Sequence, residues 1–140
     1  MSQENMKLAR RAFDAFNRRD LDAMLALSHE DVLVESRLVV MEGGYHGREG
    51  VRRWWVHTFD VLPDYKIEVE EVRDLGEFTL ARIHAHAHGA GSAAPLDETI
   101  WHAAQWRDGR YVWWRNVMTE DEALDAIGLR ESDTGHEASP

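Results

Sequence analysis

The sequence contains no cysteine, which excludes disulfide bonds, thiolate nucleophiles and cysteine-ligated metal sites. It also lacks any apolar run near the roughly 20 residues that a membrane-spanning helix requires. The N-terminal stretch MSQENMKLARR has no apolar segment of the kind found in secretory signals. These absences are compatible with a reducing compartment, and we expect a cytoplasmic protein with no membrane partner.

Positive charge is scarce as well. Lysine and arginine together number 16 against 26 aspartates and glutamates, which gives a formal net charge of −10 at pH 7. The arginines are scattered and form no basic stripe. Because proteins bind nucleic acids largely through cation–phosphate contacts, this composition argues against a nucleic-acid partner. It disfavours anionic membrane surfaces for the same reason.

The 140 residues are enough for one domain with a sizeable core. The chain shows no repeat and no linker that would separate a second domain. We assign residues 1–129 to a single domain. Residues 130–140, RESDTGHEASP, are polar and charged, so we assign them to a disordered tail.

Hydrophobic periodicity divides the chain into helices followed by strands. It predicts helices over residues 4–18, 21–27 and 47–62, and strands over 31–36, 65–73, 78–88, 96–107 and 110–118. Thr119 and Glu122 fit a capping box that opens a short final helix, which Gly128 ends. This order indicates an α+β fold. We expect a cone-shaped, half-open barrel in which a curved antiparallel or mixed sheet wraps around three N-terminal helices.

The strongest turn signal is Asp108-Gly109, which lies between two strand-like runs. A two-residue loop would pair Arg107 with Arg110, whereas a three-residue loop with a left-handed Gly109 would pair Trp106 with Arg110. The two registers place opposite sets of side chains inside. We prefer the second, because it gathers an apolar face. That face comprises Ile100, His102, Ala104, Trp106, Val112, Trp114 and Asn116.

His102 and Asn116 are the two polar residues on this face, predicted as diagonal cross-strand neighbours roughly 7–8 Å apart. A neutral imidazole in an apolar cup can exchange protons near working pH, and the amide can orient it or the ligand. The alternative is a structural histidine with no catalytic role. We assign His102 and Asn116 as catalytic candidates.

Further pocket candidates come from other elements. Ser36, at the end of the first strand, is expected to form a hydrogen bond with a ligand or the backbone. The third helix offers Trp54 and Phe59, and the hairpin offers Trp114. The hairpin tryptophans could form one aromatic cup, but we favour a split by face. In that split Trp101 and Trp113 lie outside, in the sheet-to-sheet contact of a homodimer.

Three histidines alternate along one strand, at positions 84, 86 and 88, so they share a face. This spacing suits metal ligation, but it also suits a stripe that faces solvent or a second copy. We include His84 and His86 among the pocket residues, and the choice of face stays open. No carboxylate or fourth ligand is clearly placed, so we predict no metal and no cofactor.

Several motifs together resemble the nuclear transport factor 2-like superfamily, and most of all its SnoaL-like, polyketide-cyclase-like branch. They are AFDAFNRRDLDAMLAL, DVLVES, YHGREGVRRWW, the Asp108-Gly109 hairpin and TEDEALDAIGL, which together span residues 5–129. The resemblance implies a cone-shaped α+β barrel with an apolar pocket, usually in a homodimer. The scaffold hosts isomerases, cyclases, hydrolases and non-catalytic binders.

The resemblance also implies roles for particular positions. Ketosteroid isomerases have an aspartate base where this chain has Ser36, so the isomerase pattern is not met. Polyketide cyclases have an inward histidine and an inward aspartate, which correspond here to His102 and Asn116. An asparagine can orient a carbonyl group, but it cannot take a proton.

Two functions follow. The first is a cofactor-independent acid–base enzyme of the isomerase, cyclase or hydrolase class, acting on a small apolar molecule that bears a carbonyl group. The second is a non-catalytic protein that binds an apolar ligand or serves as a dimeric accessory domain. The sequence specifies neither the substrate nor the reaction.

Overall fold

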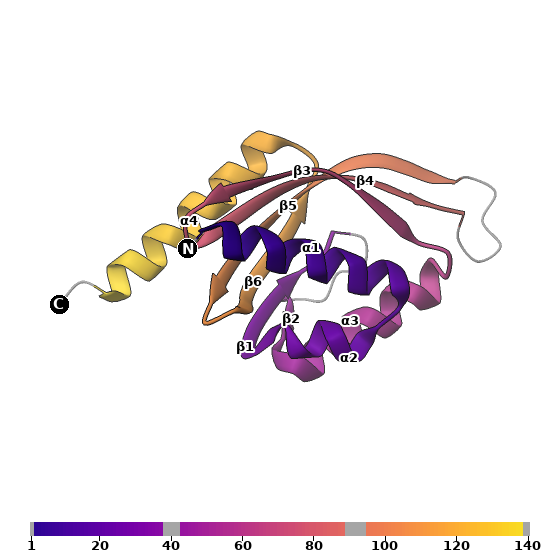
Figure 1. The fold of residues 1–140 in the computed structure, drawn as a ribbon, viewed down its shortest axis with the longest axis horizontal. Coiled ribbons are helices and arrows are strands. Elements are labelled where there is room, and N and C mark those ends of the chain that lie inside the picture. The colour runs from indigo at the N-terminus through magenta and orange to yellow at the C-terminus, as the bar shows by residue number, and fades with distance from the viewer. Residues whose placement is uncertain (1, 38–42, 89–94, 139–140) are drawn as a thin grey trace.

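The computed structural model describes residues 2–37, 43–88 and 95–138 and consists of helices and one six-stranded sheet (Figure 1). The helices are α1 (Ser2–Arg18), α2 (Leu21–Ala26), α3 (Gly47–Val61) and α4 (Glu120–Ala138). The strands are β1 (Ser28–Glu35), β2 (Tyr45–His46), β3 (Lys66–Leu75), β4 (Phe78–Ala87), β5 (Leu96–Arg107) and β6 (Arg110–Val117).

The strands are ordered β2-β1-β6-β5-β4-β3, so the N-terminal strands join the C-terminal hairpin. Strand β1 runs parallel to β6, and all the other pairs are antiparallel. The sheet has two edges, β2 and β3, and does not close on itself. The predicted α+β class and half-open form are therefore confirmed.

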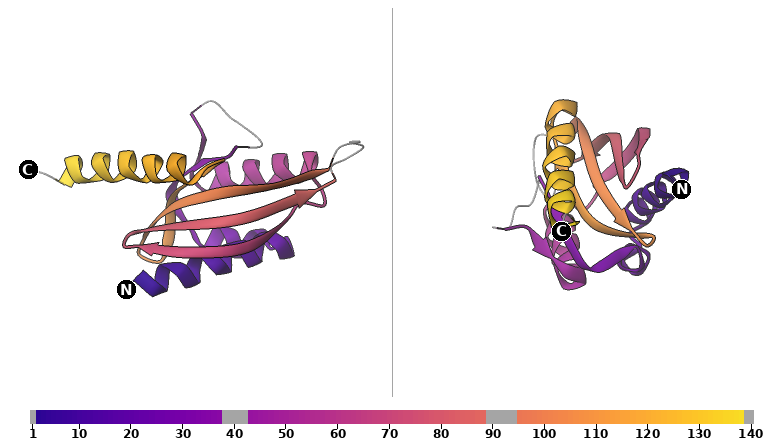
Figure 2. Two further views of the ribbon diagram at one scale, coloured as in Figure 1. Left: turned by 90° about the horizontal axis from the view of Figure 1, so that it is seen from above. Right: turned by 90° about the vertical axis from the view of Figure 1, so that its left-hand side faces the viewer.

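The sheet separates two layers of helices (Figure 2). Helices α1, α2 and α3 pack on the inner face, where their apolar side chains join Ile83, Ile100 and Trp114 in the larger core. Helix α4 lies on the outer face, in a smaller core with Trp113 and Ala103. Because neighbouring residues of a strand point to opposite faces, the strands β1, β4, β5 and β6 contribute to both cores.

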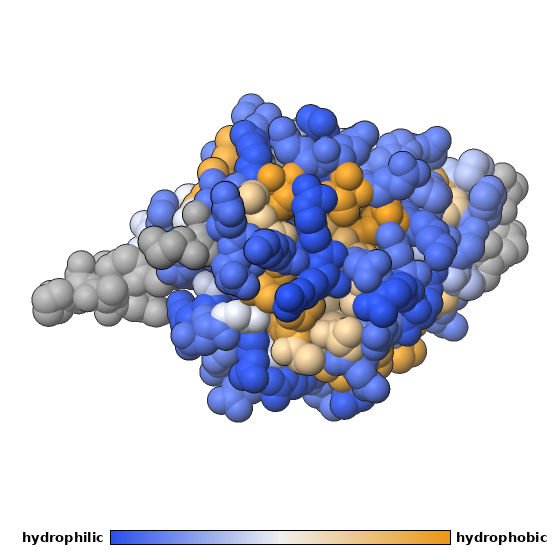
Figure 3. Space-filling view, viewed as in Figure 1, coloured by the Kyte–Doolittle hydropathy of each residue, from blue (hydrophilic) through white to orange (hydrophobic). Residues whose placement is uncertain are grey.

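Helix α1 crosses the face seen in Figure 3, which is largely hydrophilic with smaller hydrophobic areas near its centre. Its apolar stripe explains this arrangement, because Ala9, Ala12 and Phe13 are buried against the sheet while Arg10 and Arg11 are exposed. The helix predicted over residues 4–18 is therefore confirmed.

The hairpin tip differs from the prediction. Arg107 pairs with Arg110, so the loop has two residues, and both Asp108 (φ 54°) and Gly109 (φ 77°) are left-handed. Left-handed geometry at both positions matches the twist of the flanking strands. A bulge then inserts Val112 between the pairs Trp106–Tyr111 and Gln105–Trp113. The three-residue loop is therefore wrong, but the bulge returns His102 and Asn116 to the face predicted for them.

The C-terminal helix is longer than predicted. The capping box is present, since the Thr119 hydroxyl accepts from the Glu122 amide at 3.1 Å. The helix then continues through Gly128 to Ala138, so the predicted stop at Gly128 is wrong. It includes most of the segment that the sequence assigns to a disordered tail. None of the described helices combines the length and apolar character needed to cross a membrane.

Candidate functional site

A cavity of about 50 Å³ lies between the inner face of the sheet and the helices α1, α2 and α3. Its walls are mostly apolar. The apolar lining comprises Ala12, Phe13, Phe16, Met24, Trp54, Ile67, Ile83, Ile100 and Trp114. The cavity is far smaller than the roughly 300–1,000 Å³ of pockets that enclose drug-sized ligands. It holds a small chemical group rather than a whole ligand.

The polar wall of this cavity is built around His102. Its Nδ1 lies 2.8 Å from Asn116 Oδ1, and its Nε2 lies 3.2 Å from the Tyr111 hydroxyl. An amide oxygen only accepts, so Nδ1 carries the proton and donates to Asn116. Nε2 is then the acceptor, and the Tyr111 hydroxyl donates to it. His102 and Asn116 are direct partners across β5 and β6, closer than the predicted diagonal neighbours.

Burial controls protonation at this wall. Desolvation lowers the pKa of His102 from 6.5 to about 4, although the hydrogen bond with Asn116 opposes that change. Desolvation likewise raises the pKa of the Tyr111 phenol above its ordinary value. At neutral pH both groups are uncharged, so His102 has a free-base Nε2 and Tyr111 keeps its proton.

Aromatic rings enclose the imidazole. Phe13 meets it edge-on at 5.0 Å and Trp114 lies at 5.2 Å, with Trp54 packed against Trp114 at 4.8 Å between ring centroids. Trp54 and Trp114 line the cavity, in agreement with the prediction. Phe59 does not. It packs against the ring of Phe16 and lies beneath a guanidinium group, because its position on α3 faces the turn after α1.

Arg37, which the sequence analysis missed, is the one charged residue among the described residues that line the cavity. Its Nη2 forms an ion pair with Glu98 of β5. Nearby, burial raises the pKa of the Tyr65 phenol to about 12, and the positive charge of Arg37 opposes that rise. Ser36, which precedes Arg37, also lines the cavity as predicted.

Two polar atoms at the cavity residues lack a hydrogen-bond partner within the described part of the chain. They are the Arg37 Nε and the Thr58 hydroxyl oxygen. Both atoms are buried, and a buried donor without a partner costs about 1–3 kcal/mol. Such atoms in a native structure indicate where another molecule, a ligand or water, completes the hydrogen bonding.

A surface cleft of about 600 Å³ adjoins the cavity. Ser36, Arg37 and Asn116 line both spaces. The cleft is more polar, since Glu35, Arg115 and Glu122 contribute to its walls. These three shared residues form the junction between a small apolar cavity and a wider polar cleft.

The alternating histidines lie on the outer face, so the placement of His84 and His86 in the pocket is wrong. Ile83 and Ala85 occupy the inner face of β4 instead, because apolar side chains fill the core. His84 pairs with Asp97, His86 Nε2 lies 3.5 Å from Glu68, and His88 Nδ1 lies 2.9 Å from Asp64. Across the described residues, no three histidine or acidic side chains converge to hold a metal.

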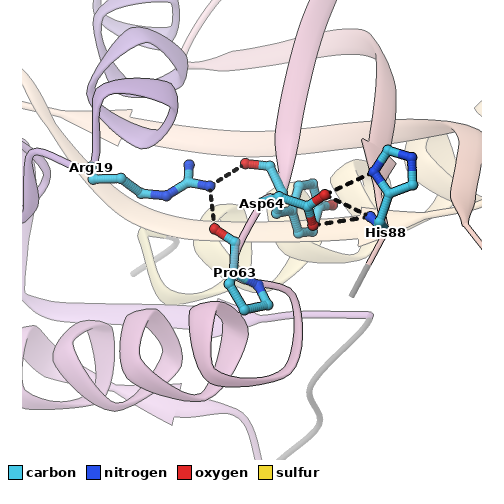
Figure 4. A network of polar contacts seen from close by, with 5 residues as sticks. Arg19, Pro63, Asp64 and His88 are labelled. Carbon is cyan, nitrogen blue, oxygen red and sulfur yellow. Dashed lines mark hydrogen bonds and ion pairs between the residues drawn. The ribbon is translucent and has the colours of Figure 1, made fainter. Parts of the chain in front are cut away.

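The turn after α1 fixes the position of Tyr65. Arg19, itself left-handed (φ 61°), donates from Nη2 to the carbonyl oxygens of Pro63 at 3.0 Å and of Tyr65 at 2.6 Å. Asp64, between them, accepts from the backbone amide and ring of His88 (Figure 4). The network joins α1, the α3–β3 connection and the end of β4, and so holds one end of the cavity.

The two remaining hairpin tryptophans lie on the outer face, as the split by face predicts. Trp113 is 2% exposed beneath α4 and donates to Glu35 Oε1 at 2.7 Å. Trp101 lies between the guanidinium groups of Arg73 and Arg82, each 5.9 Å from its ring. The chain's own helix therefore covers Trp113, which corrects its predicted place in a contact with a second copy.

The fold has several solved counterparts. A nuclear transport factor 2-like protein of unknown function from Burkholderia pseudomallei shares 20% identity with a TM-score of 0.75, over 87% of this chain and 95% of that one. IdmH, described as a putative polyketide cyclase from Streptomyces antibioticus, shares 23% identity with a TM-score of 0.68, over 88% and 97%. TerC, co-crystallised with polyporic acid, shares 16% identity with a TM-score of 0.73, over 91% and 96%.

No curated protein matches the sequence of this chain. Residues 9–114 match the family model described as the SnoaL-like domain, which covers most of the chain. The match includes all of α2, α3 and β5 and the larger part of α1 and β6, and the solved counterparts have the same fold. The chain therefore belongs to the SnoaL-like domain family, within the nuclear transport factor 2-like superfamily.

Proposed function

We propose that the protein binds a small, largely apolar molecule bearing a carbonyl group, and that His102 moves a proton on it. The observation that carries this proposal is the hydrogen-bonded group of His102, Asn116 and Tyr111 on the wall of a mostly apolar cavity. Buried polar groups that face an apolar cavity require hydrogen-bond partners. A ligand with a carbonyl group would supply an oxygen as such a partner and a proton for His102 to transfer.

The proton step uses the lone pair of His102 Nε2, which the Tyr111 hydroxyl releases when the ligand binds. Nε2 takes a proton from the carbon next to the ligand's carbonyl group, and the electron pair of that C–H bond moves to form an enolate. The Asn116 side-chain NH₂, for which the described residues provide no hydrogen-bond partner, donates to the enolate oxygen. Return of the proton from His102 to a different carbon of a conjugated enolate completes an isomerisation. For a ring closure, the enolate carbon attacks a second carbonyl carbon of the ligand, and His102 gives its proton to the oxygen of that carbonyl group.

Similar proteins support this class of ligand. The family is described as SnoaL-like, one solved counterpart is a putative polyketide cyclase, and another was crystallised with polyporic acid. The low pKa of His102 and the amide at position 116 favour the second candidate, a binder without catalysis. The experiment must therefore separate binding from proton transfer.

Deuterium exchange makes this separation without knowledge of the product. Tetralone, a bicyclic aromatic ketone, is incubated with the protein in heavy water, and NMR follows loss of the protons next to its carbonyl group. The native protein should accelerate the exchange, His102→Ala should abolish it, and the outer-face control His84→Ala should retain it. Binding is measured in parallel by tryptophan fluorescence, since Trp54 and Trp114 line the cavity.

Each outcome decides between the candidates. Binding without accelerated exchange in the native protein would establish the non-catalytic binder and reject the enzyme. Exchange that persists in His102→Ala would reject His102 as the base. Absence of both binding and exchange would reject a carbonyl-bearing apolar ligand.

We also propose that two copies associate through the part of the outer face that α4 leaves open. Helix α4 covers Trp113, but Trp101 on the same face is only partly buried. Analytical ultracentrifugation should show a dimer for the native protein, and Trp101→Glu should shift it to a monomer. A native monomer at high concentration would reject this association.

A further inference from the structure

The cavity and the cleft meet at a positively charged group. Arg37 lines both spaces, and no carboxylate lines the cavity among the described residues. Glu98 contacts Arg37 but is absent from the lining of both spaces. It therefore holds the guanidinium in place from strand β5 without occupying the space itself.

The guanidinium retains capacity for another partner. An arginine has five N–H donors, and the pair with Glu98 uses Nη2. The buried Nε has no hydrogen-bond partner among the described residues, and neither has the hydroxyl of Thr58 on the opposite, helical wall. A guanidinium with unused donors is suited to an oxygen that carries negative charge.

Strand β5 also sets the distance between Glu98, which holds Arg37, and His102. Glu98, Ile100 and His102 follow each other on the inner face of β5, where Glu98 is 25% exposed and His102 is buried. His102 follows Glu98 by four positions of extended strand, which corresponds to roughly 13 Å between their Cα atoms. Ile100 thus separates the imidazole from the carboxylate that holds Arg37, whereas Asn116 lines the junction together with Arg37.

We propose that Arg37 selects ligands with an acidic oxygen, an enol, phenol or carboxylic acid, beside the apolar part that enters the cavity. This assignment rests on the proposed function of the cavity and names the substrate class more closely. The acidic oxygen accepts from Arg37 at the junction, and the apolar body enters the cavity. The rest of the molecule extends into the cleft of about 600 Å³, which explains how a cavity of about 50 Å³ serves a larger ligand.

A matched pair of probes tests the acidic oxygen. Lawsone is a naphthoquinone with an acidic hydroxyl group, and its methyl ether has the same rings with that group blocked. Calorimetry at neutral pH should show that the native protein binds lawsone roughly tenfold or more tightly than the ether, as one charge-assisted hydrogen bond predicts. Arg37→Met should remove this preference, and Arg37→Lys should retain part of it.

Two further variants control for folding and for general charge. Arg37→Met leaves Glu98 without its cation, so the double variant Arg37→Met/Glu98→Gln removes both charges and should lose the preference while circular dichroism shows a native fold. Arg110→Gln removes an exposed arginine at the hairpin tip and should keep the preference.

The experiment can reject the role of Arg37 separately from the proposed function. If the native protein binds both probes equally, or the preference survives in both Arg37→Met variants, the role of Arg37 is overturned and the proposed function stands. If neither probe binds, both proposals fall.

Discussion

One sheet presents histidines on both faces, and they are in opposite chemical situations. His102, on the inner face of β5, is 5% exposed and bonds to two uncharged groups, Asn116 and Tyr111. His84 and His86, on the outer face of β4, are 35% and 42% exposed, and each faces a carboxylate. The residue type is the same, but the two faces give it different hydrogen-bonding partners and different exposure to solvent.

The difference shows what makes a histidine a candidate for chemistry. Exposed pairs between side chains at the surface, such as those of the outer histidines with carboxylates, contribute little to stability. Neutral partners in an apolar wall suit an imidazole that stays uncharged and keeps a lone pair for a ligand. The inner histidine is therefore the functional candidate, although the outer ones have the more conspicuous spacing.

The largest expected effect is the loss of stability when a tryptophan is removed from the inner face of the sheet rather than from the outer face. Trp114→Ala removes a buried ring that contacts both Trp54 and His102, and it should lower the free energy of unfolding by roughly 3–5 kcal/mol. Trp101→Ala on the outer face, where the ring is only partly buried, should cost clearly less. Urea denaturation measures both, and equal losses would contradict the division into an inner core and an outer surface.

Lowering the pH should destabilise the folded protein through His102, the histidine of the inner face. Its pKa is about 4 in the folded protein and 6.5 ordinarily, so between these pH values the unfolded chain binds a proton that the folded protein does not. The stability from His102 is complete above about pH 6.5 and is lost as the pH falls towards 4, by about 2–3 kcal/mol. Urea denaturation at about pH 7 and pH 4.5 should show that His102→Gln is less acid-sensitive than the native protein by this amount, while His86→Gln behaves like the native protein.

Substitutions of Asn116 should shift the pKa of His102 upward or downward, depending on the new side chain. Asn116→Asp places a carboxylate beside Nδ1 and should raise the pKa of His102 by roughly 2. Asn116→Ala removes the hydrogen bond that favours the charged form and should lower that pKa below about 4. NMR titration of the imidazole protons gives both values. Shifts of the same sign in both variants would show that Asn116 does not control His102.

The smallest effect belongs to the outer face. His84 and Asp97 form an exposed pair, with 35% and 68% of their side chains accessible. A double-mutant cycle of His84→Gln and Asp97→Asn should give a coupling free energy below about 1 kcal/mol. A coupling of several kcal/mol would show that the outer histidines are structurally as important as the inner one.

Much of the site follows from periodicity in the sequence. Strand alternation placed His102, Asn116 and Trp114 on one face, and helical spacing offered Trp54; all four line the cavity. The fold class followed from the order of helices and strands. These features depend on local pattern, which a single sequence contains.

Other parts of the site depend on contacts between distant residues. Arg37 follows the end of β1, and its direction is set by Glu98, far along the chain on β5. Tyr111 shares a face with His102 because the two-residue loop pairs it with Trp106. The bulge at Val112, which no local signal announces, then brings Asn116 to that face. By contrast, the alternation of Ile83, Ala85 and Ala87 did indicate that His84 and His86 point outward, and their metal-like spacing was the weaker guide.

The bulge at Val112 separates the geometry of the hairpin tip from that of the site. A change of loop length by one residue ordinarily moves every side chain of a ribbon to the other face. Here the extra residue lies between the tip and the pair His102–Asn116, so it offsets the register that the two-residue loop sets. A label or a linker attached at the tip would lie roughly 20 Å along the strands from the His102–Asn116 pair.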